Sequence, residues 1–358
     1  MKKVIMIAGG GTGGHIYPGL AIARALQKLD PNVEIQFVGT AQGLESKIVS
    51  KEKIPIHLIH GGQLNFAGNP LRKLKTLIKL PLGLFQSFAL ILKHNPSFVL
   101  GVGGYASGPF LLAAVLLGKK TAIWEANAYP GMANRWLAQF VQKCFLVFED
   151  SKALLKNPNS IVFGMPVRAE MEKEATHRPR SDEKFHLLHY GGSQGSRIIG
   201  RNLHSALKKG GAWTENLKVV HQTGALDHAD FLERYKGFES LVEVHEFIYN
   251  MPDFYEWADL VVCRGGASTL NELAAFGLPA IVIPLPAADG HQEKNAEMLV
   301  KAEAARMILQ KDLTPEKLIN EIETLRQNPA LREKLKANIR KFHRPKAAEA
   351  IAKAILET

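Results

Sequence analysis

A histidine closes a glycine-rich loop near the start of the chain. Residues 9–15 read GGGTGGH, with five glycines before His15. The loop follows an apolar run at residues 4–8 and precedes apolar residues at helical spacing up to residue 26, which predicts strand, loop and helix. Backbone N–H groups at a helix N-terminus suit a phosphate. His15 is therefore a candidate general base beside an anion site, although a lone histidine can also just cap or pack.

The same loop contains the dinucleotide-binding pattern GxGxxG, at Gly9, Gly11 and Gly14. That pattern needs an acidic residue about 20 residues later, at the end of the second strand, to bind a ribose. The second predicted strand ends in QFVGTAQ, residues 36–42, with no Asp or Glu before Glu45. His15 also stands where a Walker A loop has its lysine. The sequence thus predicts an anion-binding loop and no nicotinamide or ATP cofactor.

A second glycine turn lies in the other half of the chain. Residues 264–269 read RGGAST and open a predicted helix whose first turn carries Glu272. Small and hydroxyl residues at a helix start suit a diphosphate, and Arg264 adds positive charge. The Glu272 carboxylate can accept hydrogen bonds from a vicinal diol such as ribose, or it can be a capping residue at position N3. The glycine turn before it favours the nucleotide interpretation.

Metal ligands are missing from this pattern. No two aspartates are separated by a single residue, so the DxD motif of metal–diphosphate sites is absent, and the histidines lack metal-ligand spacing. We expect no bound metal and no cofactor. A diphosphate leaving group would be stabilised by helix dipoles and Arg264 instead.

Strand and helix patterns alternate through both halves, which predicts the α/β class with parallel sheets. The first half has apolar strand patterns at residues 4–8, 34–38, 56–59, 97–102, 121–124 and 145–148. The second half repeats them at 185–190, 218–222, 242–246, 260–263 and 280–284, with the boundary near residue 164. Two such domains with glycine loops at strand ends would form one ligand-binding cleft.

The basic charge is unevenly distributed. The chain carries 45 Lys and Arg against 34 Asp and Glu, and no acidic residue lies between Lys53 and Glu125. Within that tract Ile78, Leu82, Phe85 and Phe88 share one face of a helix that begins or breaks near Pro81. Basic residues beside an apolar stripe suit an anionic lipid surface, although a core-facing helix with a solvated basic face fits the periodicity too. No motif for nucleic acid accompanies the charge.

Composition indicates a reducing compartment. The only cysteines, Cys144 and Cys263, lie far apart in the sequence and suggest no disulfide framework. The apolar run after Lys2 and Lys3 is too short for a signal peptide. The uncharged tract at residues 98–118 contains five glycines and Pro109, so it predicts strand, loop and buried helix rather than a membrane span.

Seven motifs follow one another along the chain: GGGTGGHIYPGLAIA (9–23), GVGGYASGP (101–109), GMPVR (164–168), GGSQGSR (191–197), FIYNM (247–251), RGGASTLNELAAFGLPAIVIP (264–284) and DGHQEKNA (289–296). With them the chain closely resembles, over essentially its whole length, the MurG family, the undecaprenyldiphospho-muramoylpentapeptide β-N-acetylglucosaminyltransferases of bacterial peptidoglycan synthesis. The resemblance implies the GT-B fold, two Rossmann-like domains facing each other across a deep cleft. It implies an acceptor and membrane-facing domain at 1–163, a UDP-GlcNAc-binding domain at 164–342, and a final helix at 343–358 that packs back on the first domain.

The resemblance also implies the reaction and its residues. GlcNAc would move from UDP-GlcNAc to the 4-hydroxyl of the muramoyl sugar of lipid I, with inversion, to give lipid II. On the donor, the Ile248 backbone would meet the uracil, Glu272 the ribose and Gln292 the sugar hydroxyls. The diphosphate region would be met by Ser193, Ala267, Ser268 and Thr269, and Asn127 and Arg168 would line the donor site.

On the acceptor side, the resemblance implies two loops and a base. Thr12, Gly13 and Gly14, with the loop Gly103-Gly104-Tyr105, would hold the donor sugar and the acceptor diphosphate. His15 is the candidate base, and Glu125 is a second candidate. Trp124 and Ala126 stand where many relatives have His and Gln, and His291 precedes Gln292 where some have Gln, so roles built on those residues do not transfer.

The family docks on the cytoplasmic face of the inner membrane through an apolar patch ringed by basic residues, and the stripe from Ile78 to Phe88 matches that patch. We therefore expect a peripheral membrane enzyme whose partners are UDP-GlcNAc, lipid I, an anionic membrane surface and other cell-wall synthesis proteins, but not nucleic acid. Two alternatives stay open. A UDP-GlcNAc 2-epimerase would need the donor but no lipid acceptor, and a non-catalytic membrane scaffold would need neither His15 nor Glu272.

Overall fold

The computed structural model describes residues 3–11, 13–41, 45–62, 70–167, 182–287 and 289–358, apart from the side chains of residues 46, 47 and 70–79. The chain forms two compact units. The first comprises Met1–Arg168 together with Arg344–Thr358, and the second comprises Ala169–His343.

The first unit is built on a parallel sheet of seven strands in the order β3-β2-β1-β4-β5-β6-β7. Its strands are β1 (Lys3–Gly9), β2 (Val33–Thr40), β3 (Ile56–Ile59), β4 (Phe98–Gly103), β5 (Lys120–Glu125), β6 (Lys143–Leu146) and β7 (Ser160–Val162). The sequence predicted the first six, because strands buried on both faces are apolar throughout. It missed β7, which has only three residues and pairs with β6 at the sheet edge.

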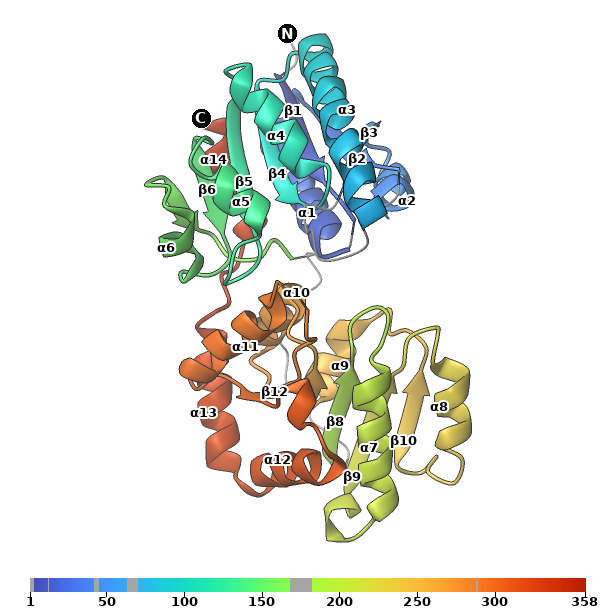
Figure 1. Cartoon of the computed structure of the whole chain (residues 1–358). Coiled ribbons are helices and arrows are strands. Elements are labelled where there is room, and N and C mark those ends of the chain that lie inside the picture. Colours follow the sequence, from blue (N-terminus) through green and yellow to red (C-terminus); the bar gives the residue numbers. More distant parts are fainter. Residues whose placement is uncertain (1–2, 12, 42–44, 63–69, 168–181, 288) are drawn as a thin grey trace. The chain divides into compact units, whose positions relative to one another are not determined.

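The helices of this unit are α1 (Gly13–Leu29), α2 (Glu45–Lys51), α3 (Pro70–His94), α4 (Ser107–Leu116), α5 (Met132–Leu137), α6 (Ser151–Leu155) and α14 (Ala347–Leu356). The last of these, drawn in red in Figure 1, returns from the end of the chain and packs against α1. Two lysines bind its carbonyl end: Lys3 Nζ donates to the Leu356 carbonyl at 3.3 Å and Lys143 Nζ to the Ala354 carbonyl at 3.2 Å. The end of the chain thereby completes the first unit.

The expectation that a helix begins or breaks near Pro81 was wrong. Pro81 lies inside α3, which runs unbroken for 25 residues. A proline inside a helix removes one backbone hydrogen bond, and that loss is tolerated where water can replace the missing donor. Pro81 is exposed, which meets this condition.

The second unit repeats the architecture with six parallel strands in the order β10-β9-β8-β11-β12-β13. Its strands are β8 (Phe185–Tyr190), β9 (Leu217–Gln222), β10 (Val242–His245), β11 (Leu260–Cys263), β12 (Ala280–Val282) and β13 (Arg306–Met307). Its helices are α7 (Arg197–Lys209), α8 (His228–Arg234), α9 (Met251–Trp257), α10 (Ala267–Phe276), α11 (His291–Lys301), α12 (Pro315–Gln327) and α13 (Pro329–Arg340). The predicted α/β class with two parallel sheets is confirmed.

Each unit has its own apolar core between sheet and helices. In the first, buried Met6, Val99 and Phe110 belong to one cluster, and in the second Leu187, Val262 and Ile322 do the same. Among the described residues, no helix has the length and apolar character needed to cross a membrane.

The strand orders determine where ligands can bind. In the first sheet the chain reverses its direction of travel across the sheet between β1 and β4, which are neighbours, and in the second it does so between β8 and β11. The loops at the carboxyl ends of such neighbours diverge to opposite faces and leave a crevice. In both units the loops at this point carry the glycine motifs.

Candidate active site

In the first unit, the glycine loops after β1 and β4 interlock. The Gly10 N–H donates to the Gly103 carbonyl at 3.2 Å. A Cβ atom at Gly104 would lie 2.2 Å from the Gly10 carbonyl oxygen, and both Gly103 (φ +95°) and Gly104 (φ +83°) adopt a backbone conformation that favours glycine. Any side chain at Gly104 would separate the two loops.

His15 lies in the first turn of α1 and joins this arrangement. Its Nδ1 lies 3.2 Å from the Gly10 carbonyl oxygen, and a Cβ at Gly103 would lie 2.8 Å from its ring. The tertiary structure therefore brings His15 next to the Gly103-Gly104 loop, and the roles of these residues in binding and catalysis stay predictions. Nearby, Gly13 is half-buried, Gly14 is exposed and Tyr105 is 39% exposed. Thr12 lies outside the described residues.

Glu125, the second candidate base, is buried and holds the loop that follows β5. One carboxylate oxygen accepts from the Asn127 N–H (2.9 Å) and side-chain amide (3.1 Å), and the other accepts from the Gly131 N–H (3.1 Å) and the Asn134 amide (2.8 Å). These four donors account for both oxygens. The carboxylate thus fixes the loop that carries Asn127, and a role as base stays a prediction that the geometry does not favour.

In the second unit, Arg264 is buried and connects several loops by hydrogen bonds. Its guanidinium donates to the carbonyls of Ile283 (3.0 Å) and Pro284 (3.2 Å) and to the Ser196 hydroxyl (2.9 Å). Burial lowers the pKa of Arg264 to about 10, so the group stays charged at neutral pH. Arg264 ties the loops after β8, β11 and β12 together, and a direct contact with diphosphate stays a prediction.

Glu272 lies at the end of a chain of buried hydroxyl groups. The Tyr255 hydroxyl donates to Glu272 Oε2 at 2.7 Å and lies 2.7 Å from the Tyr190 hydroxyl. Burial, with the charge of Glu272 adding to it, raises the pKa of Tyr255 well above its usual value, so this hydroxyl keeps its proton. The prediction that Glu272 lies in the first turn of its helix, with an N3 capping role as the alternative, was wrong: α10 begins at Ala267, so Glu272 lies in the second turn.

The start of α10 and the residues that support it form the rest of the candidate donor site. Ala267 is buried and Ser268 and Thr269 are half-buried in the first turn, after Gly266 at the N-cap. The Gln292 side-chain oxygen accepts from the N–H groups of Gly265 (3.1 Å) and Leu285 (3.0 Å), which aligns the glycine turn with the loop after β12. His291 Nε2 lies 3.1 Å from Asp289 Oδ2, so the imidazole contacts a carboxylate of the preceding loop.

Ile248 and Ser193 differ in their surroundings. Ser193 is exposed on the loop after β8. Ile248 is buried, and its N–H donates to the Gln222 side chain at 3.1 Å, while the Gln222 amide donates to the Gly192 carbonyl at 2.8 Å. Gln222 was not predicted as a site residue, because β9 reads LKVVHQ and its final glutamine does not stand out from the other polar residues of the strand. The Ile248 N–H can donate a hydrogen bond to a uracil only after its hydrogen bond to Gln222 is broken.

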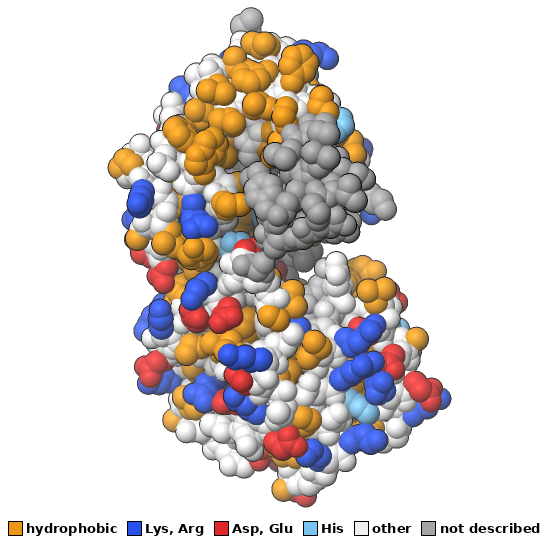
Figure 2. Space-filling view, viewed as in Figure 1, with side chains coloured by type: hydrophobic (Ala, Val, Ile, Leu, Met, Phe, Trp, Pro, Cys, Tyr) orange, Lys and Arg blue, Asp and Glu red, His pale blue; other side chains and the backbone are white. Residues whose placement is uncertain are grey.

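The predicted membrane stripe is exposed at two of the three side chains that the structure describes. On α3, Phe85 is 74% and Leu82 48% exposed, whereas Phe88 is half-buried and packs against the core. Hydrophobic side chains gather over the first unit on the face seen in Figure 2. The side chain of Ile78, and Arg168 altogether, lie outside the described residues.

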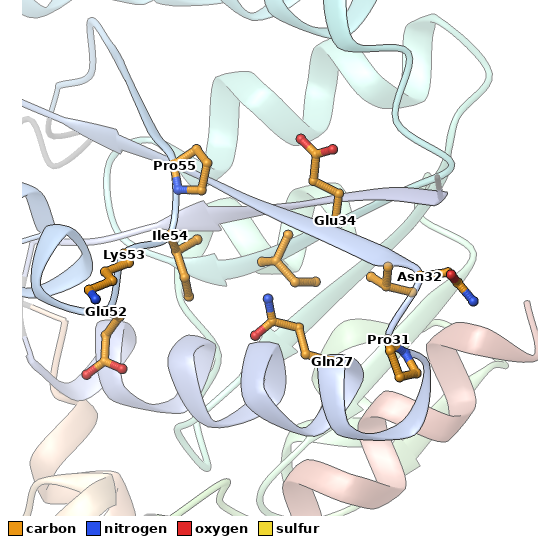
Figure 3. Close-up of a pocket in the computed structure, with 10 residues that line it drawn as sticks. Gln27, Pro31, Asn32, Glu34, Glu52, Lys53, Ile54 and Pro55 are labelled. Carbon is orange, nitrogen blue, oxygen red and sulfur yellow. The ribbon is translucent and has the colours of Figure 1, made fainter. Parts of the chain in front are cut away.

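One surface pocket of the first unit lies away from the glycine loops. It is lined by residues near the end of α1 and the start of β2, among them Gln27, Asn32 and Glu34, and by Lys53 and Pro55 before β3 (Figure 3). These are the amino ends of the strands, whereas both glycine loops follow carboxyl ends. Within the described parts of the chain, no group of three or more His, Cys, Asp or Glu side chains is placed to hold a metal ion.

Comparison with known proteins gives a consistent result. The glycosyltransferase family 28 N-terminal domain matches residues 5–146, and the glycosyltransferase family 28 C-terminal domain matches residues 186–352. The UDP-N-acetylglucosamine–N-acetylmuramyl-(pentapeptide) pyrophosphoryl-undecaprenol N-acetylglucosamine transferase of Bdellovibrio bacteriovorus is 58% identical over 100% of this chain and 99% of its own.

Solved structures agree with these sequence matches. The crystal structure of Acinetobacter baumannii MurG has a TM-score of 0.80 and 29% identity, covering 99% of this chain and 100% of its own. The crystal structure of a putative UDP-N-acetylglucosamine 2-epimerase from Listeria monocytogenes has a TM-score of 0.70 at 16% identity, covering 100% of this chain and 96% of its own. At that identity the epimerase shares the fold alone.

Proposed function

The chain belongs to glycosyltransferase family 28, and from that premise we propose that it transfers GlcNAc from UDP-GlcNAc to the 4-hydroxyl of the muramoyl sugar in lipid I, forming lipid II. The observation that carries this proposal is the 58% identity, over the full length of both chains, to a transferase named for that donor and acceptor. The fold alone would not separate a transferase from an epimerase, because fold does not imply function.

The second unit binds the donor in this proposal. The first turn of α10 directs backbone N–H groups and the hydroxyls of Ser268 and Thr269 at the diphosphate, with Ser193 on the neighbouring loop. Glu272, held by Tyr255, accepts hydrogen bonds from the ribose, Ile248 meets the uracil and Gln292 the sugar. Asn127 and Arg168 complete the donor contacts. The positive end of the α10 dipole stabilises the charge that develops on the departing UDP.

The first unit binds the acceptor and removes its proton. The acceptor 4-hydroxyl oxygen attacks C1 of GlcNAc from the face opposite to UDP, the bond from C1 to the phosphate oxygen breaks, and UDP leaves with the electron pair. His15 accepts the hydroxyl proton at Nε2, since its Nδ1 faces the Gly10 carbonyl. The loop residues Thr12, Gly13, Gly14, Gly103, Gly104 and Tyr105 position the sugar and the acceptor diphosphate. No metal ion takes part in this mechanism.

We place the enzyme at the cytoplasmic face of the inner membrane, as a peripheral protein. Exposed Leu82 and Phe85 on α3 support this, because buried in the interface they would contribute apolar area, and the acid-free basic tract around them would attract anionic lipid. Other cell-wall synthesis proteins are further partners in this proposal.

The test is transfer of labelled GlcNAc from UDP-GlcNAc to a lipid I analogue by the purified protein, with and without EDTA. We expect labelled lipid product in both reactions. Release of free N-acetylmannosamine or loss of UDP-GlcNAc without lipid product would favour an epimerase, and full loss of transfer with EDTA would contradict the metal-free mechanism. If the chain is a scaffold, His15→Ala and Glu272→Ala will leave its biological function intact.

A further inference from the structure

Glu45 is a buried carboxylate directly beneath the glycine loop of the candidate active site. It is the first residue of α2 and 1% exposed. Its Oε1 accepts hydrogen bonds from the Thr40 N–H at 2.7 Å and the Thr40 hydroxyl at 3.0 Å, and its Oε2 accepts from the Gly11 N–H at 2.8 Å. Both oxygens are thus bonded to backbone N–H groups, one at the end of β2 and one in the glycine loop.

The chain makes room for this carboxylate with two glycines. A Cβ at Gly10 would lie 2.3 Å from Glu45 Cδ, and a Cβ at Gly39 would lie 2.4 Å from its Cγ. A buried carboxylate is costly unless it is hydrogen-bonded, and the donors from Thr40 and Gly11 compensate that cost. An apolar side chain in the same space would leave the N–H groups of Thr40 and Gly11 without this acceptor. The carboxylate therefore fixes the end of β2 and the glycine loop relative to each other.

A single peptide group connects Glu45 to His15. The N–H that donates to Glu45 and the carbonyl that lies 3.2 Å from His15 Nδ1 are the two ends of the peptide between Gly10 and Gly11. In a planar trans peptide these ends point to opposite sides, so the group spans the space between the two side chains. Because a carbonyl oxygen only accepts, His15 Nδ1 must carry a proton, which leaves the lone pair of neutral imidazole on Nε2.

We propose that Glu45 is a positioning residue for His15, acting through the Gly10–Gly11 peptide. The carboxylate holds the peptide plane, so its carbonyl is fixed to receive the Nδ1 proton, and the negative charge polarises that carbonyl into a better acceptor. The arrangement performs the work of the carboxylate in a carboxylate–histidine pair, with a peptide inserted between them. This inference deepens the role of His15 in the proposed function and rests on it.

The variant that tests it is Glu45→Gln. A glutamine can offer its oxygen to the N–H of Gly11 or to that of Thr40, but whichever it serves, its NH₂ faces the other N–H donor. The peptide then loses its anchor or shifts. Glu52→Gln is the matched control, because Glu52 lies just after α2 and pairs with Arg24 in an exposed contact of 2.6 Å.

The first measurement is the tautomer of His15 in the free protein, by nitrogen-15 NMR, with its signals identified by their loss in His15→Asn. We expect the Nδ1-protonated form in the wild type and in Glu52→Gln, and a mixture with the Nε2-protonated form in Glu45→Gln. A wild-type Nε2-protonated tautomer would overturn the proposal without any variant. So would an unchanged tautomer in folded Glu45→Gln. This readout needs no substrate, so it stands even if the protein transfers no GlcNAc.

The second measurement is the steady-state transfer reaction. We expect Glu45→Gln to lower kcat by roughly 10- to 100-fold, within the range of general-base catalysis, and to change KM for UDP-GlcNAc by less than about 2-fold. A higher KM for UDP-GlcNAc with an unchanged kcat would refute the proposed action of Glu45 on His15. If Glu45→Gln fails to fold, Glu45→Asp, which keeps the charge but shortens its reach, serves in both measurements with the same expected direction.

Discussion

The two candidate bases can be separated by Glu125→Gln. In the structure four donors, two from Asn127 and one each from Gly131 and Asn134, converge on the Glu125 carboxylate. A glutamine keeps one accepting oxygen and turns an NH₂ group to the other two donors, so two hydrogen bonds are lost. Bonds to a charged acceptor are worth about 1.5–3 kcal/mol each, so we expect the free energy of unfolding of the first unit to fall by about 3–6 kcal/mol. A unit whose free energy of unfolding lies in the upper half of the ordinary range, about 5–15 kcal/mol, stays folded after that loss.

The kinetic expectation follows from the same contacts. If Glu125 only holds the loop of Asn127, Glu125→Gln raises KM for UDP-GlcNAc by roughly 5-fold and changes kcat by less than about 3-fold. If Glu125 were the base, kcat would fall by about 10²- to 10⁴-fold. Urea unfolding and initial rates with the lipid I analogue measure both quantities. Asn134→Ala is the control, since it removes one donor (2.8 Å) and leaves the carboxylate in place, and should cost about 1.5–3 kcal/mol with kcat unchanged. A loss of kcat above about 100-fold in Glu125→Gln, with unfolding as in the wild type, would refute our interpretation.

Three further outcomes are expected. Replacing Leu82 and Phe85 together by Ser should weaken binding to anionic vesicles by roughly 100-fold, because about 3 kcal/mol of apolar transfer is lost, and should barely affect stability since both side chains are exposed; unchanged sedimentation with vesicles would contradict the membrane surface. Burial lowers the pKa of His189 to about 4, so between pH 6.5 and 4 this histidine binds a proton in the unfolded chain but not in the folded state. His221 on the neighbouring strand is also buried with a lowered pKa, so the two histidines together should lower the free energy of unfolding of the second unit by up to about 2.8 kcal/mol per pH unit as the pH falls below 6.5. Urea titrations of His189→Phe should lack about half of this slope. Burial raises the pKa of Cys144 to about 12 and raises that of Cys263 as well, so neither thiol should react with a disulfide reagent at pH 8 until urea unfolds the protein.

Much of the fold was predictable because its signals are local. Strands such as β8 and β11 are apolar along their whole length, since a parallel sheet is covered on both faces, and they end at glycines that permit tight turns. Two features that such local signals do not determine were predicted wrongly. The strand β7 has only three residues, which is too short to show an apolar pattern. Pro81 predicted a helix boundary, but α3 continues through it because the proline lies on the exposed side of the helix.

The candidate site was predicted in part, for a related reason. His15 and Gly103 are far apart in the sequence, yet both could be placed at one edge of the sheet, because each follows a strand and the strands are parallel. The roles within the site could not be predicted in this way. Arg264 carried a charge suited to diphosphate, but its partners are carbonyls on a different loop, 19 and 20 residues away in sequence.

The α/β class, the glycine loops and the family could be predicted because they depend on residue types in short ordered motifs. Which polar groups bond to one another depends on contacts that form only in the folded chain. Glu45 was noted in the sequence merely as an acid too late to bind a ribose, and the fold places it under the glycine loop with its Oε2 2.8 Å from the Gly11 nitrogen. Such contacts join residues on different strands and helices, so the strand order and the close approach of glycine backbones fix them, and no local pattern records them.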